Sequence, residues 1–227
     1  MRGEVLTLDA QLDLKGRLRG QPAVFKAEAQ GAGQNWTLGA LAIQLGDNRI
    51  NGSGSLQQRL AGRIDLDLPR LGQLWPRLQG QVKGRLDVAG TLQAPQGTLT
   101  LQGQRLAQAE NRLQQLDLDA RLDNAQRGVI ELKATGIHLG DTALGTLQAN
   151  GKGDIRQQAL TLALDGPQLK LDLGLDGQLS KGDWRGRLAS GRIQAGGQDW
   201  RLQSPARLQR LASGQLDFGA HCWRSGQ

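Results

Sequence analysis

The segment Gln168–Leu179 has the clearest pattern of apolar and polar positions in the chain. Leucine occupies alternate positions at Leu169, Leu171, Leu173, Leu175 and Leu179, with lysine, aspartate, glycine or glutamine between them. Side chains of a β-strand point alternately to opposite faces, so this spacing gives one leucine face and one polar face. On a helix the same leucines would be scattered around the cylinder. The pattern therefore predicts a half-buried strand.

The same alternation recurs along most of the chain, beginning with a long strand predicted at residues 6–18. Turns rich in Gly, Asn, Asp and Pro separate the segments, which predicts roughly fourteen strands. Between Pro69 and Pro76 the apolar spacing instead predicts a short helical turn, where Trp75 either caps a groove or simply packs. A turn is expected near Glu110, followed by another strand. Short connections favour antiparallel neighbours, so we expect a meander.

A sheet with one apolar face must cover that face, and no long amphipathic helix is available to do so. The fold could be a barrel, a sandwich or an open trough. Small residues recur at inward positions, namely Gly16, Ala27, Gly52, Gly54, Gly62, Gly84, Ala120, Ala134 and Gly151. Two such walls in contact would leave costly voids, which hydrocarbon chains of a guest could fill. Alternatively, the glycines only relieve strand bending in a closed core, and the pattern does not decide between these readings.

The fold class that we predict is all-β, an elongated and curved antiparallel sheet folded into an open hydrophobic groove. Its candidate lining consists of the apolar residues at inward positions of the longest alternating segments. These are Leu6, Leu8, Leu12, Leu14, Ile64, Leu66, Val82, Leu86, Val88, Leu118, Ile130, Leu132, Leu160, Leu162, Leu164, Leu169, Leu171, Leu173, Leu175 and Leu188. With two phenylalanines, five tryptophans and no tyrosine, such a lining would be smooth and aliphatic.

The formal net charge of +7 comes mainly from arginines spread along the polar positions. Examples are Arg17, Arg63, Arg85, Arg121, Arg185 and Arg187. Nucleic-acid binding usually needs clustered basic residues with aromatic stacking platforms or a known motif, and we expect none here. A solvated sheet face is the simpler reading, and weak attraction to anionic lipid headgroups is the functional alternative.

The sequence contains no motif that indicates catalysis or a cofactor. His221 and Cys222 are adjacent, but no further ligands flank them as a metal site requires. Paired aspartates such as Asp65 and Asp67 fit a solvated strand face. No nucleophile elbow, phosphate-binding loop or dinucleotide fingerprint is present, so we predict no enzyme. The sequence has no apolar run of about 20 residues and no signal peptide, and strand-like sequence directly follows Met1.

Three segments resemble a known family in their order along the chain. Residues 78–95 read LQGQVKGRLDVAGTLQAP, residues 183–205 contain DWRGRLASGRIQ and WRLQSP, and His221-Cys222-Trp223 stands near the end. The first string is widespread in the AsmA-like superfamily. The whole combination resembles the TamB family, the inner-membrane subunits of the bacterial translocation and assembly module.

The resemblance implies a long protein of the Gram-negative periplasm with a repeating β-groove, also called a β-taco. Residues 1–227 would be a single groove segment, without the N-terminal membrane anchor and without the C-terminal region that engages the outer-membrane barrel TamA. The implied function is transport of phospholipids between the two membranes, with acyl chains in the groove. Assembly of outer-membrane barrels and autotransporters is the alternative, through templating by edge strands, and a structural spacer is a third. The family has no catalytic residues to transfer.

Overall fold

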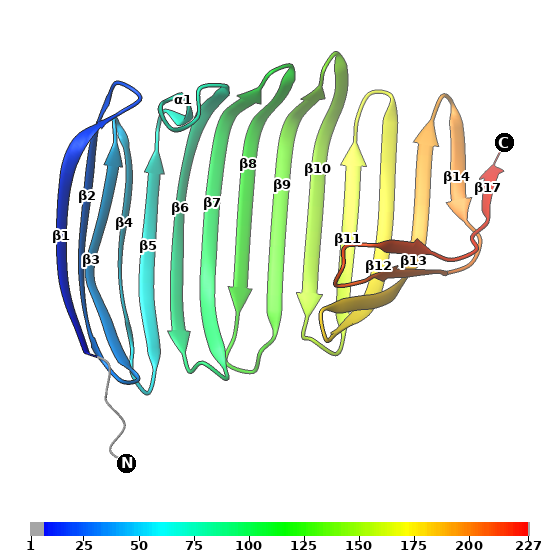
Figure 1. The fold of residues 1–227 in the computed structure, drawn as a ribbon. Coiled ribbons are helices and arrows are strands. Elements are labelled where there is room, and N and C mark those ends of the chain that lie inside the picture. The colour runs from blue at the N-terminus through cyan, green and yellow to red at the C-terminus, as the bar shows by residue number, and fades with distance from the viewer. Residues whose placement is uncertain (1–6, 227) are drawn as a thin grey trace. The chain divides into compact units, whose positions relative to one another are not determined.

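The computed structural model describes residues 7–226, which form seventeen strands and one helix of four residues (Figure 1). The strands are β1 Thr7–Leu18, β2 Gln21–Ala32, β3 Asn35–Leu45, β4 Asn48–Leu56, β5 Leu60–Leu68, β6 Leu78–Gly90, β7 Pro95–Gln108, β8 Asn111–Leu122, β9 Gly128–Leu139, β10 Thr142–Gly153, β11 Gln158–Asp165, β12 Leu169–Ser180, β13 Asp183–Ala195, β14 Gln198–Leu202, β15 Ala206–Arg210, β16 Leu216–Phe218 and β17 Trp223–Gly226. The sheet is antiparallel and open, not closed into a barrel. The predicted all-β class and open antiparallel sheet are therefore confirmed.

Two compact units make up the chain. Unit 1 contains the residues up to Ala109 together with Arg121–Ala125, and unit 2 contains Glu110–Ala120 together with the residues from Gln126 onward. In unit 1, strands β1 to β7 pair in sequence order, as a meander requires. In unit 2, strands β9 to β13 do the same.

The register of unit 1 lines up apolar residues in rows that cross the strands. One row contains Leu14, Phe25, Ile43, Ile50, Leu66, Gly84 and Leu101, and the next contains Leu12, Ala27, Leu41, Gly52, Ile64, Leu86 and Leu99. Cross-strand neighbours on one face are the unit of sheet stabilisation, so these rows form a continuous apolar face. A register shift between Leu38 and Leu41 is accommodated by a bulge in β3.

The helix α1 (Leu71–Leu74) lies over one end of this apolar face. Asn48 is two residues before Ile50 on β4, so its side chain points to the same face. Its amide donates to the carbonyl oxygen of Arg70 at 2.9 Å, and its Oδ1 accepts the Arg70 backbone N–H at 3.1 Å. Leu71 is buried against this end of the sheet, and Asn48 is buried with its hydrogen bonds satisfied. The helical turn predicted between the two prolines is confirmed.

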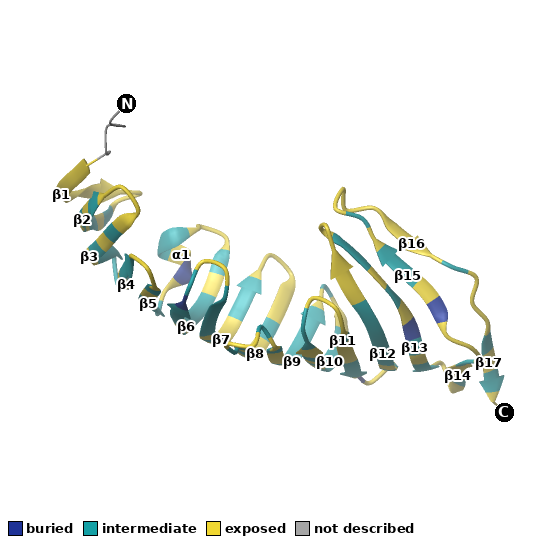
Figure 2. Ribbon diagram, turned by 90° about the horizontal axis from the view of Figure 1, so that it is seen from below, coloured by how far each residue is buried: buried dark blue, intermediate teal, exposed yellow. Residues whose placement is uncertain are grey.

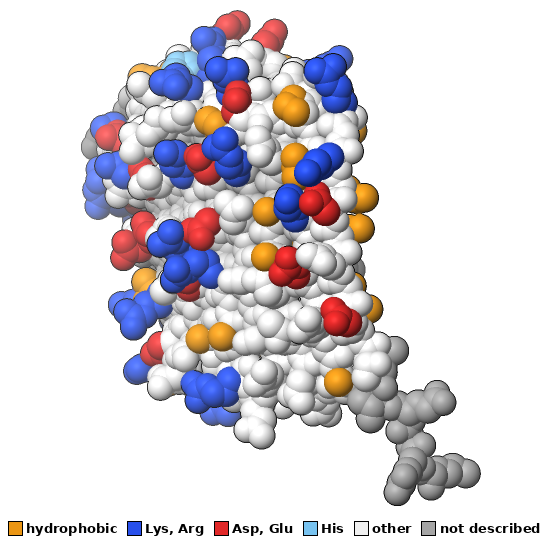
Figure 3. Space-filling model, turned by 90° about the vertical axis from the view of Figure 1, so that its left-hand side faces the viewer, with side chains coloured by type: hydrophobic (Ala, Val, Ile, Leu, Met, Phe, Trp, Pro, Cys, Tyr) orange, Lys and Arg blue, Asp and Glu red, His pale blue; other side chains and the backbone are white. Residues whose placement is uncertain are grey.

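Opposite charges face each other across the strands on the other side of the sheet. Within residues 7–226, ion pairs join residues that are direct register partners, among them Asp13–Lys26, Asp65–Arg85, Asp67–Lys83, Arg63–Asp87, Asp165–Lys170 and Asp176–Arg187. Figure 3 shows acidic and basic side chains beside one another on the side of the molecule that it views. The arrangement agrees with the expected solvated face rather than with a clustered basic surface.

The sheet of unit 2 forks at β13. One end of β13 pairs with β14, which continues to β17, and the other end pairs with β15, which continues to β16. Leu188 and Ala206 are partners across β13 and β15 and are 5% and 1% exposed. The fork therefore holds part of the small buried core. The prediction of roughly fourteen strands was too low, because β15 and β17 each contain few apolar residues and show no clear alternation.

Candidate functional site

Most of the predicted lining residues of unit 1 lie on its apolar face. Register and alternation place Leu8, Leu12, Leu14, Ile64, Leu66, Val82, Leu86 and Val88 on the side that carries α1. Leu14 on the outermost strand is 55% exposed, and Figure 2 shows β1 exposed along its length. The remaining positions on later strands are half-buried or exposed, so this face is largely uncovered among the described residues. Leu6 lies outside the described residues.

The predicted residues of unit 2 form equivalent rows. The register joins Ile130, Gly151, Leu160, Leu175 and Leu188 in one row, and Leu132, Ala149, Leu162, Leu173 and Gly191 in the next. A third row contains Ala134, Leu147, Leu164, Leu171 and Ile193, and Leu169 pairs with Ala195 beyond it. Leu118 is half-buried on β8 and does not line either of the two hollows described below.

A hollow of about 300 Å³ indents the apolar face of unit 1. Its apolar lining includes Leu41, Ile64, Leu86 and Val88, with Trp36 at one end. We call it the unit 1 hollow. Its volume is near the lower end of the range for small-molecule pockets, about 300–1,000 Å³. An aliphatic guest would fit its chemistry, because no titratable group other than Arg63 borders it.

A second hollow of about 320 Å³ lies on the apolar face of unit 2. Val129, Ile130, Leu160, Leu175 and Trp184 provide its apolar lining. We call it the unit 2 hollow. Each unit thus has its own aliphatic depression bordered by one tryptophan, and three of the predicted lining residues meet in each.

Glycines shape the floors of both hollows. A Cβ on Gly52 would lie 3.2 Å from the carbonyl oxygen of Arg63 and 3.5 Å from Ile64 Cγ1, and one on Gly151 would lie 2.7 Å from Ile130 Cγ2. Neighbouring groups therefore already occupy part of the space that a side chain at these two positions would take. The glycines at the inward positions lower the floor of each hollow and also let these neighbouring groups approach.

The two tryptophans were not among the predicted lining residues. Trp36 donates from Nε1 to the carbonyl oxygen of Gly33 at 2.9 Å, and Trp184 donates to Gln158 Oε1 at 2.9 Å. Each indole thus satisfies its polar atom and leaves its ring to the apolar surroundings. Trp184 and Leu188 are an even number of positions apart on β13, so they lie on the same face of the strand. The spacing alone therefore predicts that Trp184 lies on the apolar face. Trp36 precedes the bulge in β3, which breaks the alternation with Leu41.

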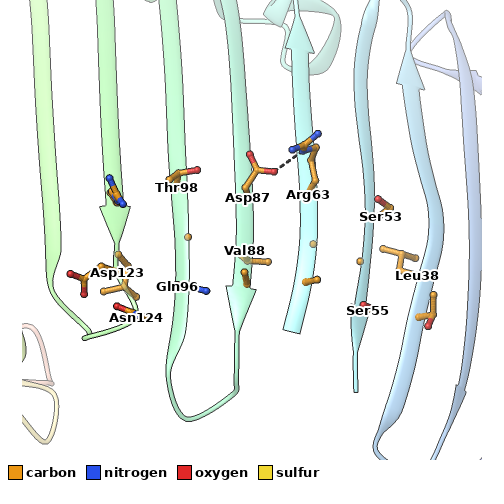
Figure 4. A pocket seen from close by; sticks show the side chains of 18 of the residues that line it. Leu38, Ser53, Ser55, Arg63, Asp87, Val88, Gln96, Thr98, Asp123 and Asn124 are labelled. Carbon is orange, nitrogen blue, oxygen red and sulfur yellow. Dashed lines mark hydrogen bonds and ion pairs between the residues drawn. The ribbon is translucent and has the colours of Figure 1, made fainter. Parts of the chain in front are cut away.

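A larger pocket of about 970 Å³ opens beside the polar side chains of unit 1 (Figure 4). Ser53, Arg63, Asp87, Thr98 and Asp123 are among its lining residues. Arg63 Nε donates to Asp87 Oδ1 at 2.6 Å, and this hydrogen bond, with the attraction of the carboxylate, raises the pKa of Arg63 above its ordinary value. The charge of Arg63 is thus already matched within the protein.

The structure offers no metal site among residues 7–226, where no group of three or more potential ligand side chains comes together. His221 stacks on Phe218 with ring centroids 4.2 Å apart, and Cys222 is exposed. In the same range no helix is long and apolar enough to cross a membrane. The distinctive feature of the described part of each unit is therefore an uncovered apolar face with one hollow.

Comparison with known proteins identifies both a matching family and curated relatives. The profile of the family described as "TamB, N-terminal domain" matches residues 4–227. The translocation and assembly module subunit TamB of Haemophilus influenzae is 28% identical over 184 residues, which cover 78% of this chain and 14% of that protein. The chain thus spans a small part of the relative's length. No solved structure matches it significantly.

Proposed function

Since this chain belongs to the TamB family, we propose that its apolar face is one segment of a groove that carries phospholipids between the inner and outer membranes. Residues 1–227 are then a single groove segment of a longer periplasmic protein anchored in the inner membrane. The outer-membrane barrel TamA contacts regions outside this segment. The role is transport and not catalysis, with acyl chains against the apolar face and headgroups at its mouth.

The observation that supports this proposal is the uncovered apolar face with an aliphatic hollow in each unit. Sheet faces of leucine are normally covered by a second layer, since exposed apolar area is unfavourable in water. An acyl chain supplies that cover at about 0.8 kcal/mol for each CH₂ group removed from water. Because the lining is aliphatic and mostly without charged groups, it does not select one chain over another, as a carrier of mixed phospholipids requires.

Site-specific photo-crosslinking in the full-length protein in living cells tests this function. Crosslinkers at Leu132 and Leu173 on the apolar face should capture phospholipid, identified by mass spectrometry of the adduct. The neighbouring outward positions Lys133 and Asp172 are matched controls, one residue away on the same strands. They should capture none. Equal capture on both faces, or none on either, would refute the groove.

An assembly role for outer-membrane barrel proteins is the second candidate, and the exposure of β1 favours it. All twelve residues of this strand are exposed, and an exposed strand edge can pair with an incoming strand. Under this hypothesis crosslinkers along β1 would capture unfolded barrel proteins, whereas crosslinkers in the hollows would capture no lipid. The two functions thus predict different adducts at different positions of the same protein.

A further inference from the structure

We propose that the α1 end of unit 1 holds a binding site for the anionic headgroup of a phospholipid, formed by Arg19 and Trp75. The proposal rests on the transport function above and deepens it, because it assigns a fixed orientation to a lipid in this unit. The headgroup would lie at α1 and the acyl chains would run along the strands into the unit 1 hollow.

Arg19 and Trp75 come together from distant parts of the sequence. Arg19 lies in the turn between β1 and β2, and Trp75 directly follows α1. The Arg19 guanidinium donates through Nη1 to the carbonyl oxygen of Leu74, and its central carbon lies 5.4 Å from the Trp75 ring centroid. This geometry is a cation–π contact, which holds the guanidinium in place. The β1–β2 turn is thereby joined to α1 across the end of the apolar face.

Among the described residues, the charge of Arg19 is not matched by a carboxylate, in contrast to the arginines that form ion pairs. Arg63 and Arg85 are paired with aspartates, and even Arg70, at the start of α1, pairs with Asp47 at 2.9 Å. Within residues 7–226 Arg19 has no carboxylate partner, and its Nη1 contact uses one of the five N–H donors of a guanidinium. The remaining donors can bind a phosphate in a bidentate manner.

Trp75 has the properties of a residue at the boundary between lipid and water. It is 58% exposed although large and apolar, and an indole is favoured where one side is apolar and the other is wet. Its neighbour α1 is not free to move, because Gln73 Oε1 accepts the Asp47 backbone N–H at 2.8 Å and Asn48 binds Arg70. Arg19 and Trp75 therefore form a preorganised site beside an apolar surface.

The distance from this site to the unit 1 hollow suits a lipid chain. Leu45, at the α1 end of β3, and Leu41, in the hollow, are four residues apart along the strand, about 13 Å at 3.3 Å per residue. Trp36 borders the far end of the hollow. A phospholipid with its phosphate at Arg19 would thus extend its acyl chains from α1 toward Trp36.

Binding measurements on the folded chain test the site with three probes: dioctanoyl phosphatidylglycerol, dioctanoylglycerol and inorganic phosphate. Loss of a charge-assisted hydrogen bond should weaken binding of the phosphatidylglycerol to Arg19→Gln about tenfold. Binding of dioctanoylglycerol, which has the same chains and no phosphate, should not change. Arg19→Lys keeps the charge and should retain most of the affinity. Arg59→Gln, an exposed arginine at the opposite end of the strands, is the matched control and should change neither lipid.

Three other outcomes would each refute a different part of the proposal. Equally weakened binding of both lipids to the Arg19→Gln variant would show that Arg19 only holds the β1–β2 turn against α1. That result would refute the headgroup site but not the groove. Binding of neither lipid to the unaltered chain would refute the transport function itself. If inorganic phosphate displaced phosphatidylglycerol and the acyl chains contributed nothing to the affinity, free phosphate would be the ligand. That result would refute the lipid site. Circular dichroism verifies that each variant is folded.

Discussion

An arginine placed in the middle of the apolar face should leave the protein folded, and this is the most direct test of an open face. The change is Leu173→Arg on β12, where Leu173 is half-buried and pairs with Leu162 and Gly191. In an open face the arginine stem can lie along the leucines while its head reaches water. In a closed core the same charge would be buried without a partner.

The structure sets the expected magnitudes. Full burial of a leucine contributes about 1.5–3 kcal/mol, so losing the half-buried Leu173 should cost about 1 kcal/mol, which lowers the melting temperature by about 3 °C for a chain of this size. Leu188→Arg on β13 is the matched comparison, because Leu188 is 5% exposed and packs at the fork. There the lost packing and the buried charge together should cost about 4 kcal/mol or more.

Thermal and urea unfolding of the purified variants, followed by circular dichroism, measure both values. A loss of stability in Leu173→Arg as large as in Leu188→Arg would refute the open face and favour a closed core. With the fold retained, the full-length protein carrying Leu173→Arg should lose lipid transport between the membranes, because the charge interrupts the hydrocarbon path. Assembly through the edge of β1 would be unaffected, since backbone groups carry that interaction. Normal lipid transport by the folded variant would show that this segment does not form part of the lipid path.

Three further outcomes follow from the described contacts. A double-mutant cycle on Asp65 and Arg85 should give a coupling free energy of about 0.5 kcal/mol that falls in about 1 M salt. A coupling free energy of zero would mean that the ion pair does not stabilise the sheet. The Ala212 amide donates to Asp183, and this hydrogen bond is the main cause that lowers the pKa of Asp183 below its ordinary 3.8. Its stabilisation is therefore complete above that pH and lost on acidification through the lowered pKa. The protection of the Ala212 amide against hydrogen exchange, measured relative to the intrinsic rate at each pH, should fall there, and Asp183→Asn should remove this pH dependence of the protection. Gly52→Phe should fill the unit 1 hollow and reduce lipid capture in that unit alone.

Alternation predicts the strands because one face of each is apolar, and this succeeds wherever a strand is long. The strand inferred from Gln168–Leu179 is β12, and the turn expected near Glu110 separates β7 from β8. β15 and β17 could not be recognised in the same way, since a strand of four or five residues presents too few positions for a period to appear. They are strands because β13 and β14 offer them partners.

The candidate site was predictable as a face but not as two hollows. Alternation assigns Ile64 and Leu160 to the apolar side, yet a hollow also depends on which residues are opposite each other across several strands. The bulge in β3 changes that register, so that Trp36 and Leu38 line the same hollow as Leu41. The contact between Arg19 and Trp75 lies further beyond sequence reasoning, because it joins two turns through tertiary structure alone.

The polar face explains how a uniform leucine face can keep its register. A slip by two residues preserves alternation, so rows made of leucine barely resist it. On β5 and β6 the native register sets Arg63 opposite Asp87 and Asp65 opposite Arg85. A two-residue slip in one direction would set Arg63 opposite Arg85, and a slip in the other would set Asp65 opposite Asp87. Like charges in direct opposition destabilise a sheet. The charges on one face therefore specify the pairing, so the apolar face does not need to interdigitate with a second layer to fix the register, as the proposed lipid groove requires.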